Sequence, residues 1–245
     1  MTKYPRIHIG TSGWTYPEWA GKFYPAELPQ KDWLPYYCQH FDTVELNATF
    51  YRQFPAKTFA HWYEETPEHF KFVIKVSGYI THRKHLKETD RYIKRFEKDV
   101  WHLQDKLGLL LLQFPPHMPY DPERLKAALA AFKDPSRVVV EFRDAKWLTD
   151  EVKSLLQDFK AIFCNVDSPI LQVYDTITAP VAYLRLHGHS KMYDYNYKMP
   201  QLTQIQHNIH QLIQQGAREV YILFNNDMHA YAPKNALKLQ TLCKN

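Results

Sequence analysis

The stretch Val138-Val139-Val140-Glu141-Phe142-Arg143 is a run of β-branched residues that ends with two opposite charges on alternate positions. The stretch Val181-Ala182-Tyr183-Leu184-Arg185-Leu186-His187-Gly188 has the same form. A strand with one solvated face would alternate polar and apolar residues along its whole length. In both stretches the polar residues occur only near the end. This pattern predicts strands whose outer face is covered and whose inner face opens into a polar pocket.

Short apolar runs of this kind recur along the chain, and helical patterns separate them. Composition and turn residues predict eight strands, at residues 7–10, 43–47, 71–77, 108–114, 137–143, 161–167, 181–187 and 219–225. Apolar spacing and capping residues predict helices over residues 91–107, 123–132, 201–215 and 233–242 and another from Thr149 onward. Strands that alternate with helices indicate parallel β/α units. Eight units predict an α/β fold, a single-domain TIM-like (β/α)8 barrel over residues 1–245, with an open doubly wound sheet as the competitor.

The period of two along each strand gathers the polar side chains on one face. The polar residues that share this face near the strand ends are Glu45, Asn47, Lys75, Ser77, Gln113, Glu141, Arg143, Asn165, Asp167, Arg185, His187 and Asn225. The apolar residues of the opposite face must cover the helix layer. We therefore expect the polar set to face the barrel axis at its C-terminal mouth, where barrel enzymes build their sites. The alternative is a structural ion network, because buried charges persist only when they are paired.

The residue types in this set suggest individual roles. The candidate catalytic residues are Glu45, Glu141 and His187, because carboxylates and imidazoles commonly move protons. The candidate substrate-binding residues are Trp14, Asn47, Tyr51, Lys75, Gln113, Arg143, Asp167, Arg185 and Asn225. The three cations among them suit an anion such as phosphate or carboxylate. Two alternatives stay open: His187 as a structural histidine, and Lys75 as a Schiff-base nucleophile.

No cofactor is expected, but a divalent metal stays open. The chain has neither a Gly-x-Gly-x-x-Gly nor a Gly-x-x-x-x-Gly-Lys-Ser/Thr match, which argues against a nucleotide cofactor held by those motifs. The residues of metal-ligand type at the expected mouth are Glu45, Glu141, Asp167, His187 and Asp227. The cations of the same cavity would repel a metal ion. Two His-x-x-His pairs, His82 with His85 and His207 with His210, are interpreted as surface histidines.

Aromatic residues and one long segment are expected to surround the mouth. Aromatic side chains follow the first, second and seventh strands, at Trp14, Tyr16, Trp19, Phe50, Tyr51, Tyr193, Tyr195 and Tyr197. They could stack on a sugar or base, or close the barrel end. Residues 189–200 form a long segment rich in Tyr and Lys, for which a mobile lid is a reasonable hypothesis.

Composition sets wider bounds on the partners. The chain is 45% hydrophobic and 23% charged, and no apolar run approaches the length of a membrane helix. We expect no membrane partner and, at the N-terminus, no targeting segment. Three well-separated cysteines favour a reducing cytoplasm. The net charge of +5 is compatible with a small anionic ligand and leaves nucleic acid open. The oligomeric state is unknown from the sequence.

Motifs over nearly the whole chain resemble a known family. They include Ile9-Gly10-Thr11-Ser12-Gly13-Trp14, Val44-Glu45-Leu46-Asn47-Ala48-Thr49-Phe50-Tyr51, Lys75, Ile80-Thr81-His82, Gln113-Phe114-Pro115-Pro116, Glu141-Phe142-Arg143, Arg185-Leu186-His187-Gly188 and Phe224-Asn225-Asn226-Asp227. In this order they resemble the YecE-like proteins, a domain of unknown function numbered 72. A His commonly follows Glu-Phe-Arg in that family, whereas this chain has Asp144. The resemblance implies a TIM-like barrel and a cytoplasmic protein, and it implies no established activity.

The first functional hypothesis is therefore an enzyme that needs no nucleotide cofactor and acts on a small anionic substrate such as a sugar phosphate. The rival enzyme class is a metal-dependent phosphodiesterase or nuclease of the endonuclease IV type, suggested by barrel analogy alone. The rival outside enzymes is a binding module for a nucleic acid or a metabolite.

Overall fold

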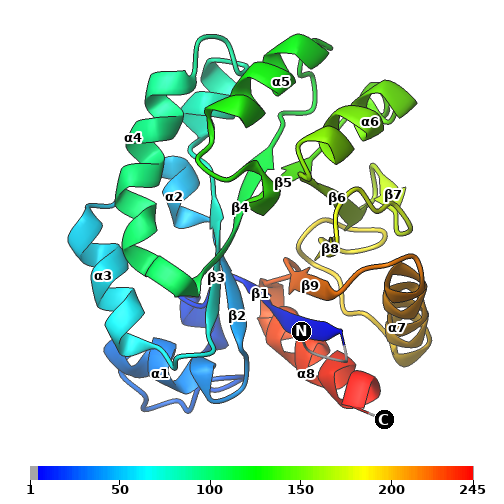
Figure 1. Ribbon diagram of the computed structural model, residues 1–245. Helices are drawn as coiled ribbons and strands as arrows, with labels where there is room; N and C mark the ends of the chain where they lie inside the picture. Colours follow the sequence, from blue (N-terminus) through cyan, green and yellow to red (C-terminus); the bar gives the residue numbers. More distant parts are fainter. Residues whose placement is uncertain (1–4, 245) are drawn as a thin grey trace.

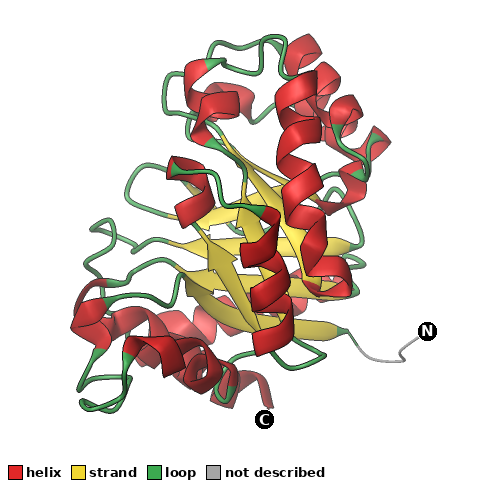
Figure 2. Ribbon diagram, turned by 90° about the vertical axis from the view of Figure 1, so that its left-hand side faces the viewer, coloured by secondary structure: helices red, strands yellow, loops and turns green. Residues whose placement is uncertain are grey.

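The computed structural model describes residues 5–244. The N-terminal end, where no targeting segment is expected, lies partly outside these residues. Eight parallel strands follow one another in the order β5-β4-β3-β2-β1-β9-β8-β6, and pairing of β5 with β6 closes the sheet. Helices surround this closed sheet (Figure 1), so the strands form the inner layer of the molecule (Figure 2). The predicted single-domain TIM-like (β/α)8 barrel is confirmed over the described residues.

The barrel strands begin and end within about two residues of the predicted positions. They are β1 (Arg6–Ser12), β2 (Thr43–Leu46), β3 (Lys71–Lys75), β4 (Leu107–Gln113), β5 (Val138–Glu141), β6 (Ile162–Asp167), β8 (Val181–Leu186) and β9 (Glu219–Phe224). A short extra strand, β7 (Gln172–Val173), pairs antiparallel with β6 and was not predicted.

The helices differ more from expectation than the strands do. The α-helices are α1 (Trp33–Cys38), α2 (Ala48–Tyr51), α3 (Ala56–Glu65), α4 (Asp90–Val100), α5 (Pro122–Ala131), α6 (Asp150–Asp158), α7 (Met199–Gln214) and α8 (Tyr231–Lys244). Helices α5 and α6 begin within about one residue of the predicted positions. Asp121 and Thr149 cap them, since each side chain accepts from a backbone N–H group of the first turn. The long helix predicted over residues 91–107 is wrong beyond Val100. A 3-10 segment with a left-handed Gln104 (φ 50°) redirects the chain into β4 there.

The side chains that fill the barrel interior are apolar toward the N-terminal ends of the strands, which we call the lower part. They are ionic toward the C-terminal ends, which we call the upper part. The lower part is filled by Val73, Leu109, Leu111, Val139, Ile162, Cys164, Val166, Tyr183, Tyr221 and Leu223. The strand register continues this inward face to the polar end, because residues paired across parallel strands point to the same side. Thus Arg185 pairs with the inward Leu223, and Gln113 pairs with Glu141. The predicted polar mouth therefore lies above a filled core.

The predicted inward face of β6 is wrong. Asn165 and Asp167 were expected to face the barrel axis, but Cys164 and Val166 do so, and Val166 pairs with the inward Arg185. On the outer face of this strand, Asn165 and Asp167 contact the chain excursion of residues 168–180. Asn165 donates to and accepts from the backbone of Thr176 in that excursion, at 2.9 Å each. Polar residues can therefore occupy the covered face because each finds a partner there.

An ion cluster closes the N-terminal end of the barrel. His8 stacks on Tyr221, with ring centroids 4.6 Å apart. Its Nδ1 lies 2.7 Å from Asp42, and its Nε2 lies 2.9 Å from Glu219. Burial acts to lower the pKa of His8, but the hydrogen bonds and charges of the two carboxylates outweigh burial and raise it from 6.5 to about 9. The protonated His8 therefore joins β1 to β9 and to the segment before β2.

We expect this cluster to stabilise the fold in a pH-dependent way. A pKa raised by folding adds stability that is complete below 6.5 and is lost as the pH rises through about 9. The His8→Gln variant should therefore lose about 3 kcal/mol more free energy of unfolding at pH 6 than at pH 10. Urea denaturation of variant and wild type at both pH values measures this difference. The exposed His61→Gln control should show none, and an equal loss at both pH values would contradict the role of the charged imidazole.

Candidate functional site

A buried arginine bridges two buried carboxylates at the upper end of the barrel. Arg185 on β8 is 1% exposed, and Glu45 on β2 and Glu141 on β5 are fully buried. The Arg185 Nε and Nη2 atoms donate to the two oxygens of Glu45 at 2.8 and 2.5 Å. Its Nη1 donates to Glu141 Oε2 at 2.5 Å. Three strands from different parts of the sheet are thus joined by one guanidinium.

Glu45 is fully enclosed by hydrogen-bond donors. Besides Arg185, the Ser12 hydroxyl donates to Oε1 at 2.8 Å and the Tyr183 hydroxyl donates to Oε2 at 2.6 Å. Burial acts to raise the pKa of Glu45, but Arg185, the Tyr183 hydroxyl and the Lys75 charge lower it below its usual value. Both carboxylate oxygens are therefore occupied, and the arrangement matches the structural network considered above better than it matches a catalytic base.

Glu141 lies closer to the mouth and contacts three partners. Its Oε1 is 2.6 Å from Arg143 Nε and 3.3 Å from His187 Nε2. Burial acts to raise the pKa of Glu141, but Arg143 and Arg185 outweigh it and hold this pKa well below its usual value. Glu141 therefore remains ionised and orients the Arg143 guanidinium at the barrel opening.

His187 is held between the ion network and an amide. Its Nε2 faces Glu141, and its Nδ1 lies 2.9 Å from the side-chain nitrogen of Asn225. Burial and the charge of Arg185 lower the pKa of His187 to about 4, although Glu141 acts in the opposite direction. The imidazole is therefore neutral at neutral pH. The structure brings together His187, Asn225 and Arg143, as the sequence predicted.

Lys75 is the cation of this region that lacks a carboxylate partner among the described residues. It is 9% exposed at the end of β3, and its Nζ lies 4.4 Å from the centroid of the Phe50 ring. Burial and the Arg185 charge lower the pKa of Lys75 to about 8, although Glu141 and Glu45 act in the opposite direction. A buried ammonium without an ion pair is costly to the fold.

A glycine makes room for the aromatic ring beside Lys75. A Cβ added at Gly78 would lie 2.7 Å from the Phe50 ring, well inside van der Waals contact. The Phe50 ring also packs against His82, with ring centroids 4.7 Å apart. Burial and the Lys75 charge lower the pKa of His82. His82, interpreted from its spacing as a surface histidine, is partly exposed and packs against Phe50 beside Lys75. Its place in the Ile80-Thr81-His82 motif was the available signal for this location.

Two amide oxygens near Lys75 have no partner among the described residues. They are Asn47 Oδ1 after β2 and Gln113 Oε1 at the end of β4, and both atoms are buried. These strands flank β3, which carries Lys75. Buried acceptors are normally paired, so each of these oxygens can take a hydrogen bond from a ligand or a water.

Three residues predicted to bind substrate lie elsewhere. Tyr51 is 82% exposed, because the single turn of α2 directs it to solvent and places the preceding Phe50 at the mouth. Trp14 is buried against the edge of Trp62 in the outer core. Asp167 lies on the outer face of β6, where it accepts from the Tyr174 hydroxyl at 2.9 Å. Alternation along a strand does not predict where a side chain of the following helical turn points, as for Tyr51. It also does not predict which face of a strand is covered by another part of the chain, as for Asp167.

Several hydrogen bonds hold the segment after β8, residues 188–197, against the barrel and α8. Gly188 has a left-handed φ of 113°, and a Cβ there would lie 2.2 Å from the Lys191 carbonyl oxygen. Its N–H donates to the hydroxyl of buried Tyr197 at 2.9 Å. The Asn235 side chain on α8 accepts from the Tyr197 N–H and donates to its carbonyl. The mobile lid over residues 189–200 stays a prediction.

The residue types expected for a metal do not converge. Among residues 5–244, no group of three or more His, Cys, Asp or Glu side chains is arranged to hold a metal ion. Glu45 and Glu141 are paired with guanidinium groups, and Asp167 lies behind β6. This donor set therefore does not fit the divalent metal that the sequence left open.

We expect the Arg185→Met variant to be strongly destabilised. Removal of the guanidinium leaves buried Glu45 without its counter-charge and buried Glu141 with Arg143 alone, which costs about 3–5 kcal/mol of unfolding free energy. Urea denaturation at pH 7 measures the loss. Arg124→Met, which breaks a partly exposed pair with Asp121, should cost less than about 1 kcal/mol. Similar losses in both variants would show that the buried bridge does not hold the barrel together.

We expect the Lys75→Met variant, in contrast, to be more stable than the wild type at pH 7. A lysine whose pKa falls from 10.5 to about 8 on folding lowers stability at every pH below about 8. This penalty is relieved as the pH rises from 8 to 10.5. The uncharged, similarly shaped Met should raise the free energy of unfolding at pH 7 by about 1–3 kcal/mol. Its advantage should shrink at pH 10.5, and a destabilised Lys75→Met variant at pH 7 would contradict an uncompensated charge.

Comparisons with known proteins agree with this architecture. The family model described as "Protein of unknown function DUF72" matches residues 8–245. UPF0759 protein YunF of Bacillus subtilis is 26% identical over 270 residues, which covers 96% of this chain and 94% of its own length. UPF0759 protein YecE of Escherichia coli is 28% identical over 109 residues, which covers 44% of this chain and 38% of its own length.

Solved structures extend the comparison. A DUF72 family protein from Thermotoga maritima is 27% identical with a TM-score of 0.89, covering 98% of this chain and 100% of its own. A xylose isomerase domain containing protein from Salmonella typhimurium is 12% identical with a TM-score of 0.59, covering 98% of each chain, and it shares the fold alone. Among the described residues, no helix is long and apolar enough to span a membrane. The family model covers nearly the whole chain, and the protein therefore belongs to the DUF72 family.

Proposed function

We propose that the barrel mouth binds a small, polyhydroxylated anion such as a sugar phosphate, and that the protein is an enzyme acting on it without a nucleotide cofactor. The observation that carries this proposal is the unpaired Lys75 ammonium, buried at the end of β3. A protein can retain such a destabilising charge when its function needs it.

The local charge balance favours an anionic ligand. The cations Lys75, Arg143 and Arg185 outnumber the carboxylates Glu45 and Glu141 by one, and His187 is neutral at neutral pH because its pKa is lowered to about 4. Arg185 is enclosed and directs its donors to the two carboxylates, so it contributes charge and no ligand contact. Lys75 and Arg143, which reach the opening, are the proposed anion-binding residues.

The neutral groups of the mouth suit hydroxyl-bearing ligands. Asn47 Oδ1 and Gln113 Oε1 are acceptors without a partner among the described residues. A sugar hydroxyl can donate to each of them while the anionic group contacts Lys75. An inorganic anion alone has fewer donors to offer, so these amides favour a polyol anion over free phosphate.

The proposed chemistry is proton transfer at Lys75 Nζ. A lysine with a pKa of about 8 exchanges its proton near neutral pH, as a general acid or base must. Glu141 and His187 remain candidates for proton transfer, and their contacts also orient Arg143. Glu45 is less suited to this role because each of its oxygens already accepts hydrogen bonds.

We expect a sugar phosphate to bind the wild type, and Lys75→Met to weaken this binding at least tenfold through loss of a charge-assisted contact. Isothermal titration calorimetry with a panel of sugar phosphates measures the affinity. Binding should be strongest between about pH 6 and 8, because the phosphate is then doubly charged and Lys75 is still protonated. Above pH 8 the affinity should fall.

Lys71→Met is the matched control, since Lys71 shares the strand and face of Lys75 but lies at its opposite end and donates to the Asp105 carbonyl. It should leave the affinity unchanged. Equal binding by wild type and Lys75→Met, or an affinity that does not fall above pH 8, would contradict the proposal. Binding without turnover of any bound compound would favour the metabolite-binding module over the enzyme.

A further inference from the structure

A second cavity of about 260 Å³ lies beside the barrel mouth. It is formed by the segment around α2 and α3, the π-helical turn at Tyr79–Arg83 and α4. Its lining residues are Thr49, Arg52, Gln53, Phe54, Phe59, Ser77, Tyr79, Ile80, Tyr92, Arg95, Phe96, Asp99 and Val100. Ser77 was expected at the barrel mouth with the polar set, and none of the other lining residues was assigned to a site from the sequence.

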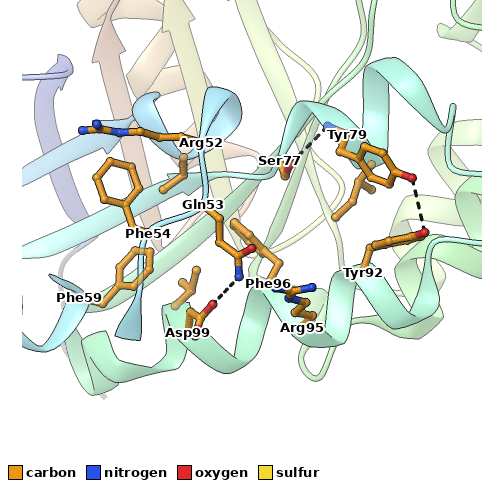
Figure 3. Close-up of a pocket in the computed structure, with 13 residues that line it drawn as sticks. Arg52, Gln53, Phe54, Phe59, Ser77, Tyr79, Tyr92, Arg95, Phe96 and Asp99 are labelled. Carbon is orange, nitrogen blue, oxygen red and sulfur yellow. Dashed lines mark hydrogen bonds between the residues drawn. The ribbon is translucent and has the colours of Figure 1, made fainter. Parts of the chain in front are cut away.

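The walls of this cavity are largely aromatic. Figure 3 shows Phe54 and Phe59 on one side of the cavity and Tyr79 and Tyr92 on the opposite side, with Gln53 between them. Phe59 is buried, whereas Tyr79 is 39% exposed at the rim. Opposed aromatic walls suit a flat apolar group, which gains by leaving water and by contact with ring faces and edges.

The charges of this cavity are predominantly positive. Asp99 is engaged by the Gln53 side-chain amide, whose nitrogen donates to it at 2.9 Å. Arg95 has no ion pair among the described residues, and the Arg52 guanidinium lies over the Phe54 ring at 4.5 Å. The lining residues therefore include two guanidinium groups and one carboxylate, and that carboxylate already has a partner. An anionic group on the ligand would complement this excess.

The backbone at the cavity is irregular. Tyr79–Arg83 forms a π-helical turn, and after Lys84 the residues His85 and Leu86 have left-handed φ angles of 46° and 62°. Such turns cost energy and occur frequently at functional sites. Here the turn places Tyr79 and Ile80 in the cavity wall, and the Tyr79 hydroxyl contacts that of Tyr92 on α4 at 3.4 Å.

We infer that this cavity is a binding site for a small organic anion with a flat apolar body of one or two rings. The volume exceeds the roughly 150 Å³ of an engineered cavity that binds benzene. The aromatic walls would hold the ring system, while Arg52 and Arg95 at the rim would hold a carboxylate, sulfonate or phosphate. Neither Lys75 nor Arg143 lines this cavity, so the inference goes beyond the function proposed for the mouth.

The two sites nevertheless share a wall. Thr49 lines the cavity, and its hydroxyl donates to the backbone carbonyl of Lys75 at 2.7 Å. Ser77 lines the cavity two residues after Lys75 on the same segment. A ligand in the cavity can therefore affect the position of Lys75 without contacting it.

Naphthalene-2-sulfonate is a suitable probe, and naphthalene-2-methanol is its neutral counterpart. Saturation-transfer NMR titrations of the full chain should show the sulfonate binding with a Kd of roughly 0.1–1 mM, as expected for a ligand of this size. Arg95→Gln and Arg52→Gln should each weaken sulfonate binding about tenfold. Binding of the neutral alcohol should change less than twofold. Both arginines are exposed, so the variants should fold normally, which thermal denaturation checks.

Lys98→Gln, an exposed residue of α4 outside the cavity lining, is the matched control and should bind like wild type. Lys75→Met should also retain sulfonate binding, which separates this site from the barrel mouth. No saturable sulfonate binding by wild type at millimolar concentration would overturn the inference. Unchanged binding in the Arg52→Gln/Arg95→Gln double variant, or loss of binding in Lys75→Met, would do the same.

Discussion

The pairing of Arg185 with Glu45 and Glu141 is the interaction on which the upper half of the barrel depends. One guanidinium joins β8 to β2 and β5, which are not neighbours in the sheet. A closed barrel of this size must be filled by side chains, and its lower part is filled by apolar ones. Nearer the C-terminal mouth, the interior is filled by the charged side chains of Arg185, Glu45 and Glu141. These three residues can replace apolar residues there because each of the three is bonded to a partner of opposite charge.

The same network determines what the barrel mouth can offer to a ligand. Arg185 donates to both carboxylate oxygens of Glu45, so neither residue is available to a ligand. Their contribution to the site is electrostatic potential and rigidity. Glu141 directs its second oxygen to Arg143 and His187, which fixes the orientation of a guanidinium close to solvent. Lys75 experiences the attraction of both carboxylates without contacting either within ion-pair distance, and its pKa remains lowered to about 8. The polar set recognised in the sequence thus contains an enclosed structural network and a smaller set of groups available to a ligand.

The cavity beside the mouth depends on features of a different kind. Its walls come from two short helices, a π-helical turn and one face of α4, and these meet only because β2 and β3 are neighbours in the barrel. No periodic pattern marks such a surface. Phe54, Tyr79 and Phe96 look like ordinary aromatic residues of loops and helix faces when they are read along the chain.

The sequence by itself determined the eight strands, the barrel and the residues near the strand ends, because the period of two and the turn chemistry are local properties. It also placed Glu45, Glu141, Arg143, Arg185 and His187 in one region. Only the tertiary structure decided which partners these charges take, since a distance between strands far apart in the chain leaves no local signal. It likewise decided that Asp167 lies behind β6 and that Tyr51 faces solvent. The face that a side chain occupies depends on what covers the strand or helical turn, and the covering segments come from elsewhere in the chain.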